Sequence, residues 1–330
     1  LKSAFGLIPF NQPYKKSLKS GQIFAIYRSA KDVRLIVLDQ RGGSRAAALN
    51  AGVNLSSYPL AAVTYPHLRL TKDALLKTVY AFVGDPACVC IGTFPRVGAA
   101  EGTPEERPAL LELEQGAERF RTLYADRAGY AGIGFYPPLQ TTFTAFLKSA
   151  VIESGGFSDE TGAEQADLLL RMYERLRREN RAFTMRLLPD AVCFELPQNS
   201  ISDACKRAGR SYGAAAAAIR KNAPQSRRIP AVRRMRMRTI GWPLLGTGGF
   251  ITLLASAALG AVSFWPAVFY LIVAALFGAL TSAAAVLVEE SAYRLQTDTG
   301  LLIRKYWAAV ISAFIYRPRA ALARMFSPRK

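Results

Sequence analysis

Residues 239–288 read TIGWPLLGTGGFITLLASAALGAVSFWPAVFYLIVAALFGALTSAAAVLV and contain no Asp, Glu, Lys, Arg or His. A bilayer core about 30 Å thick is crossed by roughly 20 apolar residues of helix. The stretch therefore predicts two membrane-spanning helices joined by a turn. We expect the turn at residues 263–266, because Pro266 lacks the N–H that a helix interior needs. Both ends of this helical hairpin would then lie on the same side of the membrane.

The charges beside this stretch indicate which side that is. Between Ala204 and Arg238 there are 11 Lys or Arg residues and no acid. Lys and Arg close to a span mark the cytoplasmic side and attract anionic lipid headgroups. We expect a multi-pass protein of the cell (inner) membrane, with its soluble domain in the cytoplasm and the lipid membrane as a partner.

The net charge of +19 and the pI near 10.1 are also typical of proteins that bind nucleic acid. The basic excess, however, crowds against the membrane segment: residues 204–330 hold 19 Lys or Arg and only 3 acids. We therefore expect no nucleic-acid partner. The four cysteines suggest neither a disulfide framework nor a zinc site, since His67 is the only histidine.

Alternating strand-like and helix-like segments in the first 200 residues predict an α/β domain. The expected strands are residues 33–38, 60–64, 87–93, 142–147, 183–188 and 191–196. The expected helices are residues 44–53, 72–82, 110–124, a segment opened by a capping box at 161–164 and ending near 178, and 200–221. Turns or loops are expected at 42–43 and 101–107.

Four regions follow from these patterns. Residues 1–200 form the α/β domain, 201–238 a basic membrane-proximal helix and linker, and 239–288 the two transmembrane helices. Residues 289–330 are expected to be cytosolic and to hold a short apolar helix at 307–316 with a basic tail behind it. This last helix is too short to span comfortably, so we expect it to lie in the membrane interface.

Three motifs resemble those of membrane-bound family 2 glycosyltransferases, the type that makes poly-N-acetylglucosamine, cellulose or hyaluronan. Residues 43–52, GSRAAALNAG, resemble the family's GGKADALNAG segment. Residues 155–157 and 163–171, GGF and AEQADLLLR, resemble its GGF and EDADLxLR stretch, and 188–197 resemble its "vPdav…teaP" stretch. The resemblance covers nearly the whole chain in order. It implies a partial GT-A-like (nucleotide-diphospho-sugar transferase) domain that begins midway through the family's catalytic domain.

The resemblance also implies a chemistry. Such enzymes are inverting transferases that use a nucleotide sugar, and a DxD motif holds Mg²⁺ or Mn²⁺ on the diphosphate. The DxD positions fall here on Tyr65 and His67. The position of the general base falls on Gln165, which cannot accept a proton at neutral pH. Glu164 remains beside it, and Asp167 is a substitute base only if the helix rotates.

The donor-binding positions are also changed. The Lys and the Asp of the family's KADALN segment are Arg45 and Ala47, whereas its Asn is kept as Asn50. Its QRxRW motif falls on residues 206–210, where Lys206 and Arg207 stand. Guanidinium groups suit phosphate, so Arg45 and Arg207 either hold an anionic ligand or are solvated surface charges. The sequence does not decide between these two.

Losses at the metal site, the base, the donor loop and the membrane-proximal motif together indicate a pseudoenzyme. We expect the chain to need no cofactor and to serve as a partner or scaffold of an active synthase subunit in cell-surface polysaccharide synthesis. One alternative is an active inverting glycosyltransferase completed by a missing N-terminal segment or a second chain. Another is a membrane-anchored module that binds anionic lipid.

Overall fold

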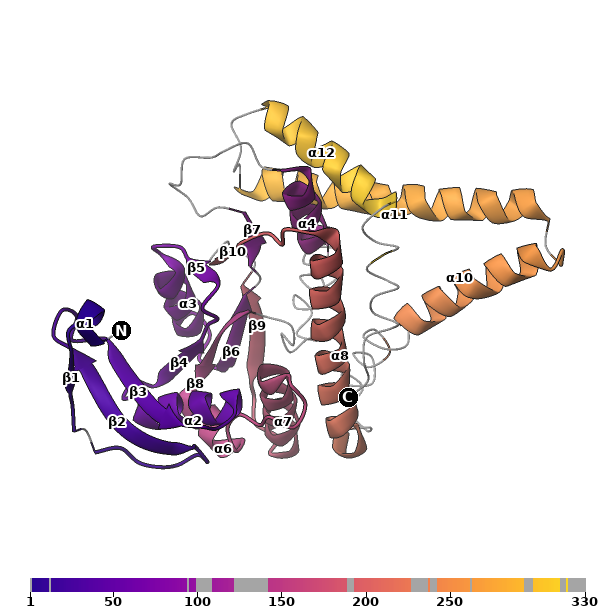
Figure 1. Cartoon of the computed structure of the whole chain (residues 1–330). Helices are drawn as coiled ribbons and strands as arrows, with labels where there is room; N and C mark the ends of the chain where they lie inside the picture. Colours follow the sequence, from indigo (N-terminus) through magenta and orange to yellow (C-terminus); the bar gives the residue numbers. More distant parts are fainter. Residues whose placement is uncertain are drawn as a thin grey trace.

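The computed structural model describes residues 2–11, 13–93, 95–98, 109–121, 142–188, 193–226, 237, 242–261, 263–293, 299–314 and 319. It confirms the mixed α/β class, with sheets in the first two hundred residues and long helices after them (Figure 1). The predicted loop at 101–107, residues 189–192 of the last motif, most of the arginine-rich segment 227–238 and most of the tail after 314 lie outside the described residues.

A small antiparallel sheet begins the chain, and the sequence motifs gave no sign of most of it. After the short helix α1 (Lys2–Phe5), β1 (Leu7–Pro9), β2 (Gln22–Ser29) and β3 (Ile36–Arg41) pair in that order. The strand predicted from residue 33 begins only at Ile36, because residues 32–35 form a turn closed by a hydrogen bond from the N–H of Leu35 to the carbonyl of Asp32.

The central sheet has the order β4-β8-β6-β9. These strands span Leu60–Val63, Phe143–Leu147, Cys88–Thr93 and Thr184–Leu188, close to the predicted ranges. β8 is antiparallel to both of its neighbours, whereas β6 and β9 are parallel. A second small sheet has the order β5-β10-β7, formed by Leu68–Leu70, Cys193–Glu195 and Arg96–Val97.

Helices cover both faces of the central sheet. The main core lies on one face, where Phe146 packs with residues of α2 (Arg45–Leu55), α6 (Lys148–Glu153), α7 (Glu164–Arg178) and α8 (Ile201–Ser226). Phe143, three residues earlier on the same strand, faces the opposite side and packs with Ala74 of α3 (Ala74–Val83). Side chains alternate along β8, so one strand serves both cores.

Two predicted helix starts differ from the structure. α3 begins at Ala74 rather than at residue 72, and the N-cap residue before it, Asp73, makes no side-chain capping bond. The predicted capping box at 161–164 is wrong, because the Thr161 hydroxyl accepts from the N–H of Ala163, outside the helix, and α7 begins at Glu164 without a side-chain cap. Ser44, where the sequence predicts the first residue of a helix, is the N-cap of α2, and its side chain accepts from the N–H of Ala47.

The apolar stretch forms two helices, α10 (Trp242–Ala258) and α11 (Phe264–Tyr293), which diverge from a shared turn (Figure 1). The break lies between Ala258 and Phe264, earlier than predicted, with Gly260 at a φ of +73°. Pro266 falls in the first turn of α11, where no helical N–H is required of it. Within the described residues, one helix, Val268–Val288, is long and apolar enough to cross a membrane. α10 has 17 residues, fewer than the roughly 20 that cross a bilayer core.

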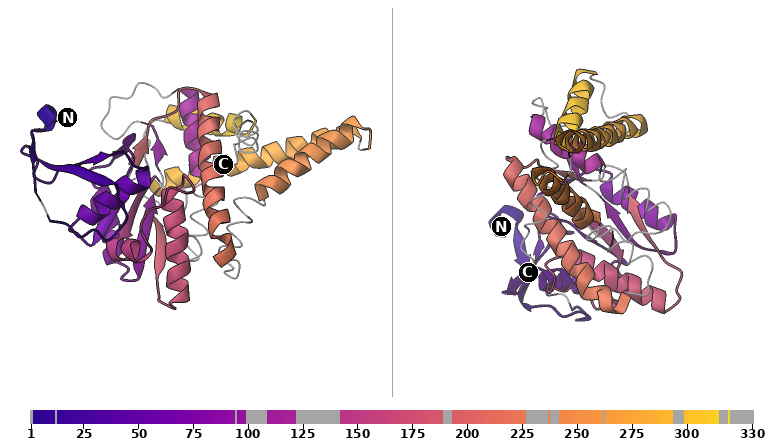
Figure 2. Two further views of the ribbon diagram at one scale, coloured as in Figure 1. Left: turned by 60° about the horizontal axis from the view of Figure 1, so that its bottom comes forward. Right: turned by 90° about the vertical axis from the view of Figure 1, so that its right-hand side faces the viewer.

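The last helix, α12 (Thr299–Phe314), starts eight residues before the predicted 307. Figures 1 and 2 show it crossing α11, with α4 (Leu110–Arg121) beside both. Ala117 of α4, Val286 of α11 and Ala309 of α12 form a small buried cluster. α4 therefore connects the α/β domain with the apolar helices.

Candidate functional site

The connection between β4 and β5 carries Tyr65 and His67, the two positions where the resemblance places metal-binding carboxylates. Two basic side chains from distant parts of the chain meet them there. Arg45 is the first residue of α2, and Arg207 lies on α8. The structure thus brings together four sequence-predicted site residues that come from three separate segments.

Arg45 contacts the ring of Tyr65. Its guanidinium carbon is 4.0 Å from the centre of the Tyr65 ring, which is a cation–π contact. The rings of Tyr65 and His67 have centres 5.4 Å apart and are tilted by 49°. The nearest carboxylate oxygen to Arg45 belongs to Glu164, at 3.8 Å, which is an ion pair but too long for a hydrogen bond.

Arg207 joins His67 to a buried carboxylate. Its Nη2 lies 2.9 Å from Nε2 of His67, and its Nη1 contacts Glu195. Glu195 ends β10, is only 3% exposed, and also accepts from Arg119 of α4 at 3.3 Å. Partial burial, the largest influence, and then the positive charge of Arg207 lower the pKa of His67; the smaller effect of Glu195 raises it, and the still smaller effect of Arg45 lowers it. The imidazole is therefore neutral at pH 7.

Glu195 and Arg119 are the site residues that sequence reasoning did not single out. Residues 195–197 were matched only as part of a family motif. An acid at the end of an apolar strand was the available signal, because a carboxylate in such a place must find a cation. The spacing gave no indication that α4 would supply one of the two cations.

The position at which the resemblance places the general base is occupied by the side-chain amide of Gln165. Gln165 is 6% exposed, and its Oε1 accepts from the hydroxyl of Thr144 at 3.3 Å. Thr144 lies opposite Val63, the last residue of β4, so the amide sits where β4 ends and the Tyr65 turn begins. Its Nε2 is buried with no hydrogen-bond partner among the described residues.

Asp167 belongs to a different network. It is fully buried and accepts from Arg171 at 2.9 Å and from Asn222 at 3.0 Å, with Lys221 3.2 Å away. Burial, the largest single influence, would lower the pKa of Lys221, but the contacts with Glu160 and Asp167 together raise it. The Asp167 carboxylate thus fastens α7 to α8.

The two remaining predicted residues have partners other than Tyr65, His67, Arg45 and Arg207. Asn50 is 3% exposed and donates to the carbonyls of Lys19 and Phe157 while accepting from the N–H of Phe157. It also explains Gly156, whose φ is +71° and where a Cβ would stand 2.5 Å from Oδ1 of Asn50. Lys206 is largely exposed and has Asp203 3.9 Å away.

The divalent metal that the resemblance implies does not fit these residues. A hard cation needs several oxygen ligands, whereas Tyr65 offers one phenol oxygen on a ring that Arg45 contacts, and His67 offers a nitrogen already in contact with Arg207. Among the described residues no group of three or more His, Cys, Asp or Glu could hold a metal ion. Two nearby positive charges would further repel a cation.

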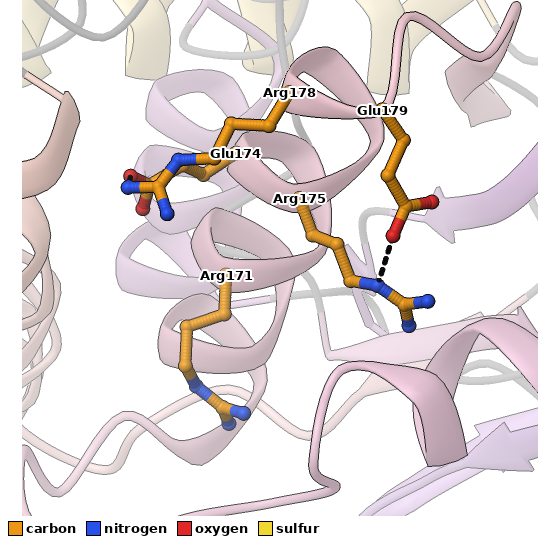
Figure 3. A pocket seen from close by; sticks show the side chains of 5 residues that line it. All are labelled: Arg171, Glu174, Arg175, Arg178 and Glu179. Carbon is orange, nitrogen blue, oxygen red and sulfur yellow. Dashed lines mark hydrogen bonds and ion pairs between the residues drawn. The ribbon is translucent and has the colours of Figure 1, made fainter.

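A separate hollow lies along one face of α7 (Figure 3), lined by Arg171, Glu174, Arg175, Arg178 and Glu179. Its charged side chains pair along the helix at i, i+4 spacing: Arg175 with Glu179 at 2.6 Å and Arg178 with Glu174 at 2.5 Å. Because the arginines of this hollow are paired with carboxylates, it is less suited to an anionic ligand than the surroundings of Arg45.

No protein-family model matches the chain, and none of the curated proteins matches it. Among solved structures, the chain is similar to the mannosyltransferase PcManGT from Pyrobaculum calidifontis, solved in complex with GDP-Man and Mn²⁺. The identity is 16%, the alignment covers 84% of this chain and 68% of that one, and the TM-score is 0.47. Similarity this distant assigns neither a ligand nor an activity to this chain.

The position of His67 between two guanidinium groups predicts its titration. It is the only histidine, so its imidazole resonances in NMR spectra of the full chain in detergent are unambiguous. Its pKa is expected below 6.5 and should rise in Arg207→Gln, which removes a positive neighbour and leaves Glu195. The substitution Arg220→Gln, on an exposed position further along α8, is the matched control. A pKa at or above 6.5 in the unsubstituted chain would contradict this geometry.

Proposed function

We propose that this chain is a membrane-bound protein of the family 2 glycosyltransferase type that has lost metal-dependent sugar transfer and acts as a partner or scaffold of an active polysaccharide synthase. The observation that carries the proposal is the charge of the site. Where the resemblance calls for paired carboxylates and a general base, the chain has Tyr65, His67 and Gln165. Tyr65 contacts the guanidinium of Arg45, and His67 contacts that of Arg207.

The chemistry of sugar transfer supports this reading. A departing diphosphate develops negative charge that a bound metal stabilises, and a positioned base removes the proton of the acceptor hydroxyl. Losing the base alone typically costs about 10²–10⁴ in rate. Glu164 does not replace it readily, because its carboxylate faces Arg45. Asp167 is held by two cations and an amide at the α7–α8 junction.

Membrane attachment is supported by α11, whose large apolar side chains are mostly uncovered. Phe269, Phe277 and Leu280 are each about two-thirds exposed. Such a continuous apolar surface on a 30-residue helix is costly in water and favourable in lipid. The arginine-rich sequence at 227–238 would lie against anionic headgroups on the cytoplasmic side.

The catalytic proposal is tested with the purified full chain in detergent. No nucleoside diphosphate should be released from UDP- or GDP-sugars, with or without Mn²⁺, while an active membrane-bound family 2 glycosyltransferase in the same assay releases it. Gln165→Asp alone should stay inactive, because it restores a base and no metal site. Turnover by the unsubstituted chain that depends on Mn²⁺ would instead favour the active inverting transferase.

The membrane proposal predicts a definite topology. Single cysteines introduced at Ser226 and Ser263 should differ in their reaction with an impermeant maleimide added to intact cells. We expect only Ser263→Cys to react, because it lies in the turn between the two apolar helices. The native cysteines are all buried, which keeps the background low. Labelling of Ser226→Cys from outside would refute the orientation.

A further inference from the structure

We propose that the outer face of α3 is a contact surface at which two copies of this chain pair, with their α3 helices antiparallel across a two-fold axis. This surface takes no part in the proposed function. Pairing there does not depend on whether the chain has lost sugar transfer.

α3 turns its large apolar side chains away from the domain. The residues that face the sheet are small: Ala74 is 0% exposed and Thr78 is 3% exposed, with the Thr78 hydroxyl donating to the carbonyl of Ala74 at 2.7 Å. The outer face instead carries five large apolar side chains that are 45–78% exposed, namely Leu75, Leu76, Val79, Tyr80 and Val83. An amphipathic surface helix normally buries its large apolar residues, and α3 does the reverse.

The five side chains form one continuous stripe. Their spacings of three and four residues place them on one side of the helix. The charges nearest to the stripe, those of Asp73 and Lys77, pair with each other at 2.7 Å. Single exposed apolar residues are common on protein surfaces, whereas a contiguous patch of this kind marks an interaction site.

The size of the stripe fits a pair of identical helices. At roughly 100 Å² for each uncovered side chain, the stripe presents about 500 Å² of apolar surface per copy. A patch of this size is as large as the largest on typical monomers. Two copies together would bury about 1,000 Å², which reaches the lower limit for a specific interface. The outer face of α3 is therefore large enough to hold a weak dimer without help from another element.

The charges at the two ends of α3 favour the antiparallel arrangement. Lys72 is exposed and stands just ahead of the helix. In an antiparallel pair it would lie near Val83 of the other copy, where the last carbonyls of α3 carry partial negative charge. A parallel pair would instead place the two Lys72 side chains side by side. The antiparallel pair also brings the same surface of both copies together, as a two-fold axis requires.

The place of α3 in the molecule favours a second copy over the lipid bilayer as the occupant. Figure 1 shows α3 on the left of the molecule, whereas the α10–α11 hairpin extends to the right. Seen from the side of the hairpin, α3 lies at the lateral edge of the α/β domain (Figure 2, right). A bilayer that holds the hairpin would not cover α3. Two copies in one membrane could meet there with their hairpins parallel.

The first test is cross-linking of the full chain in membrane vesicles that expose the cytoplasmic side. Oxidation of Val79→Cys should give a species of twice the 36.0 kDa of one chain, because Val79 lies at the middle of the stripe and meets its own copy across the axis. Lys72→Cys should not cross-link to itself, since the antiparallel pair holds these ends apart. The native cysteines are all buried, so the background is low.

Val33→Cys is the matched control for cross-linking. Val33 is 60% exposed and lies between β2 and β3, outside the stripe. It should give no covalent dimer under the conditions that cross-link Val79→Cys.

The second test measures pairing without a covalent bond. Two differently tagged copies of the full chain are produced together, and capture of one in mild detergent should retain the other. The double substitution Leu76→Gln and Val83→Gln in both copies should reduce the retained amount by about tenfold or more, because residues at the centre of an interface dominate its affinity. Both positions are exposed and Gln is a good helix former, so the fold is kept. Val33→Gln should leave the retained amount unchanged.

Three results would overturn the inference. The first is cross-linking of Val79→Cys no stronger than that of Val33→Cys, and the second is equal retention of the Leu76→Gln, Val83→Gln chain. The third is cross-linking of Val79→Cys to a protein of a different mass, which would make another subunit the occupant. Failure of the proposed function is a separate outcome, since it is observed as metal-dependent turnover and leaves the pairing of α3 untouched.

Discussion

The buried carboxylate of Glu195 is the constraint on which the arrangement of this site depends. A charge that is 3% exposed is tolerated only when it is paired, and removing one partner of such a group typically costs about 3–5 kcal/mol. Glu195 is paired twice, with Arg207 of α8 and with Arg119 of α4. These contacts fix α8 against the small β5-β10-β7 sheet and orient the Arg207 guanidinium toward His67.

The same carboxylate ties the site to the apolar helices. Arg119 belongs to α4, and α4 packs against α11 and α12 through Ala117. Gln115 of the same helix exchanges two hydrogen bonds with the backbone of Gln198, just ahead of α8. Through α4, the fold thus connects the residues around Glu195 with α11, the proposed membrane helix.

The sequence predicted the α/β class and the positions of most central strands and helices, because apolar periodicity and glycine turns are local signals. It also identified Tyr65, His67, Arg45 and Arg207, although it could not bring them together. It missed β1, β2 and the pairing of Glu195, which depend on contacts between distant segments. The turn after α10 was misplaced because Pro266 was taken as a break, whereas a proline is well suited to the first turn of a helix.

The central claim is that guanidinium groups stand where a divalent metal would be expected. Electron paramagnetic resonance of Mn²⁺ measures this directly, because aqueous Mn²⁺ gives a sharp six-line signal that is lost when the ion enters an ordered site. With a few equivalents of the full chain present and no nucleotide, the account predicts an undiminished signal, equal to that with an Arg45→Gln variant. Loss of the signal in proportion to the protein, abolished by His67→Ala, would show a metal site at this position and contradict the account.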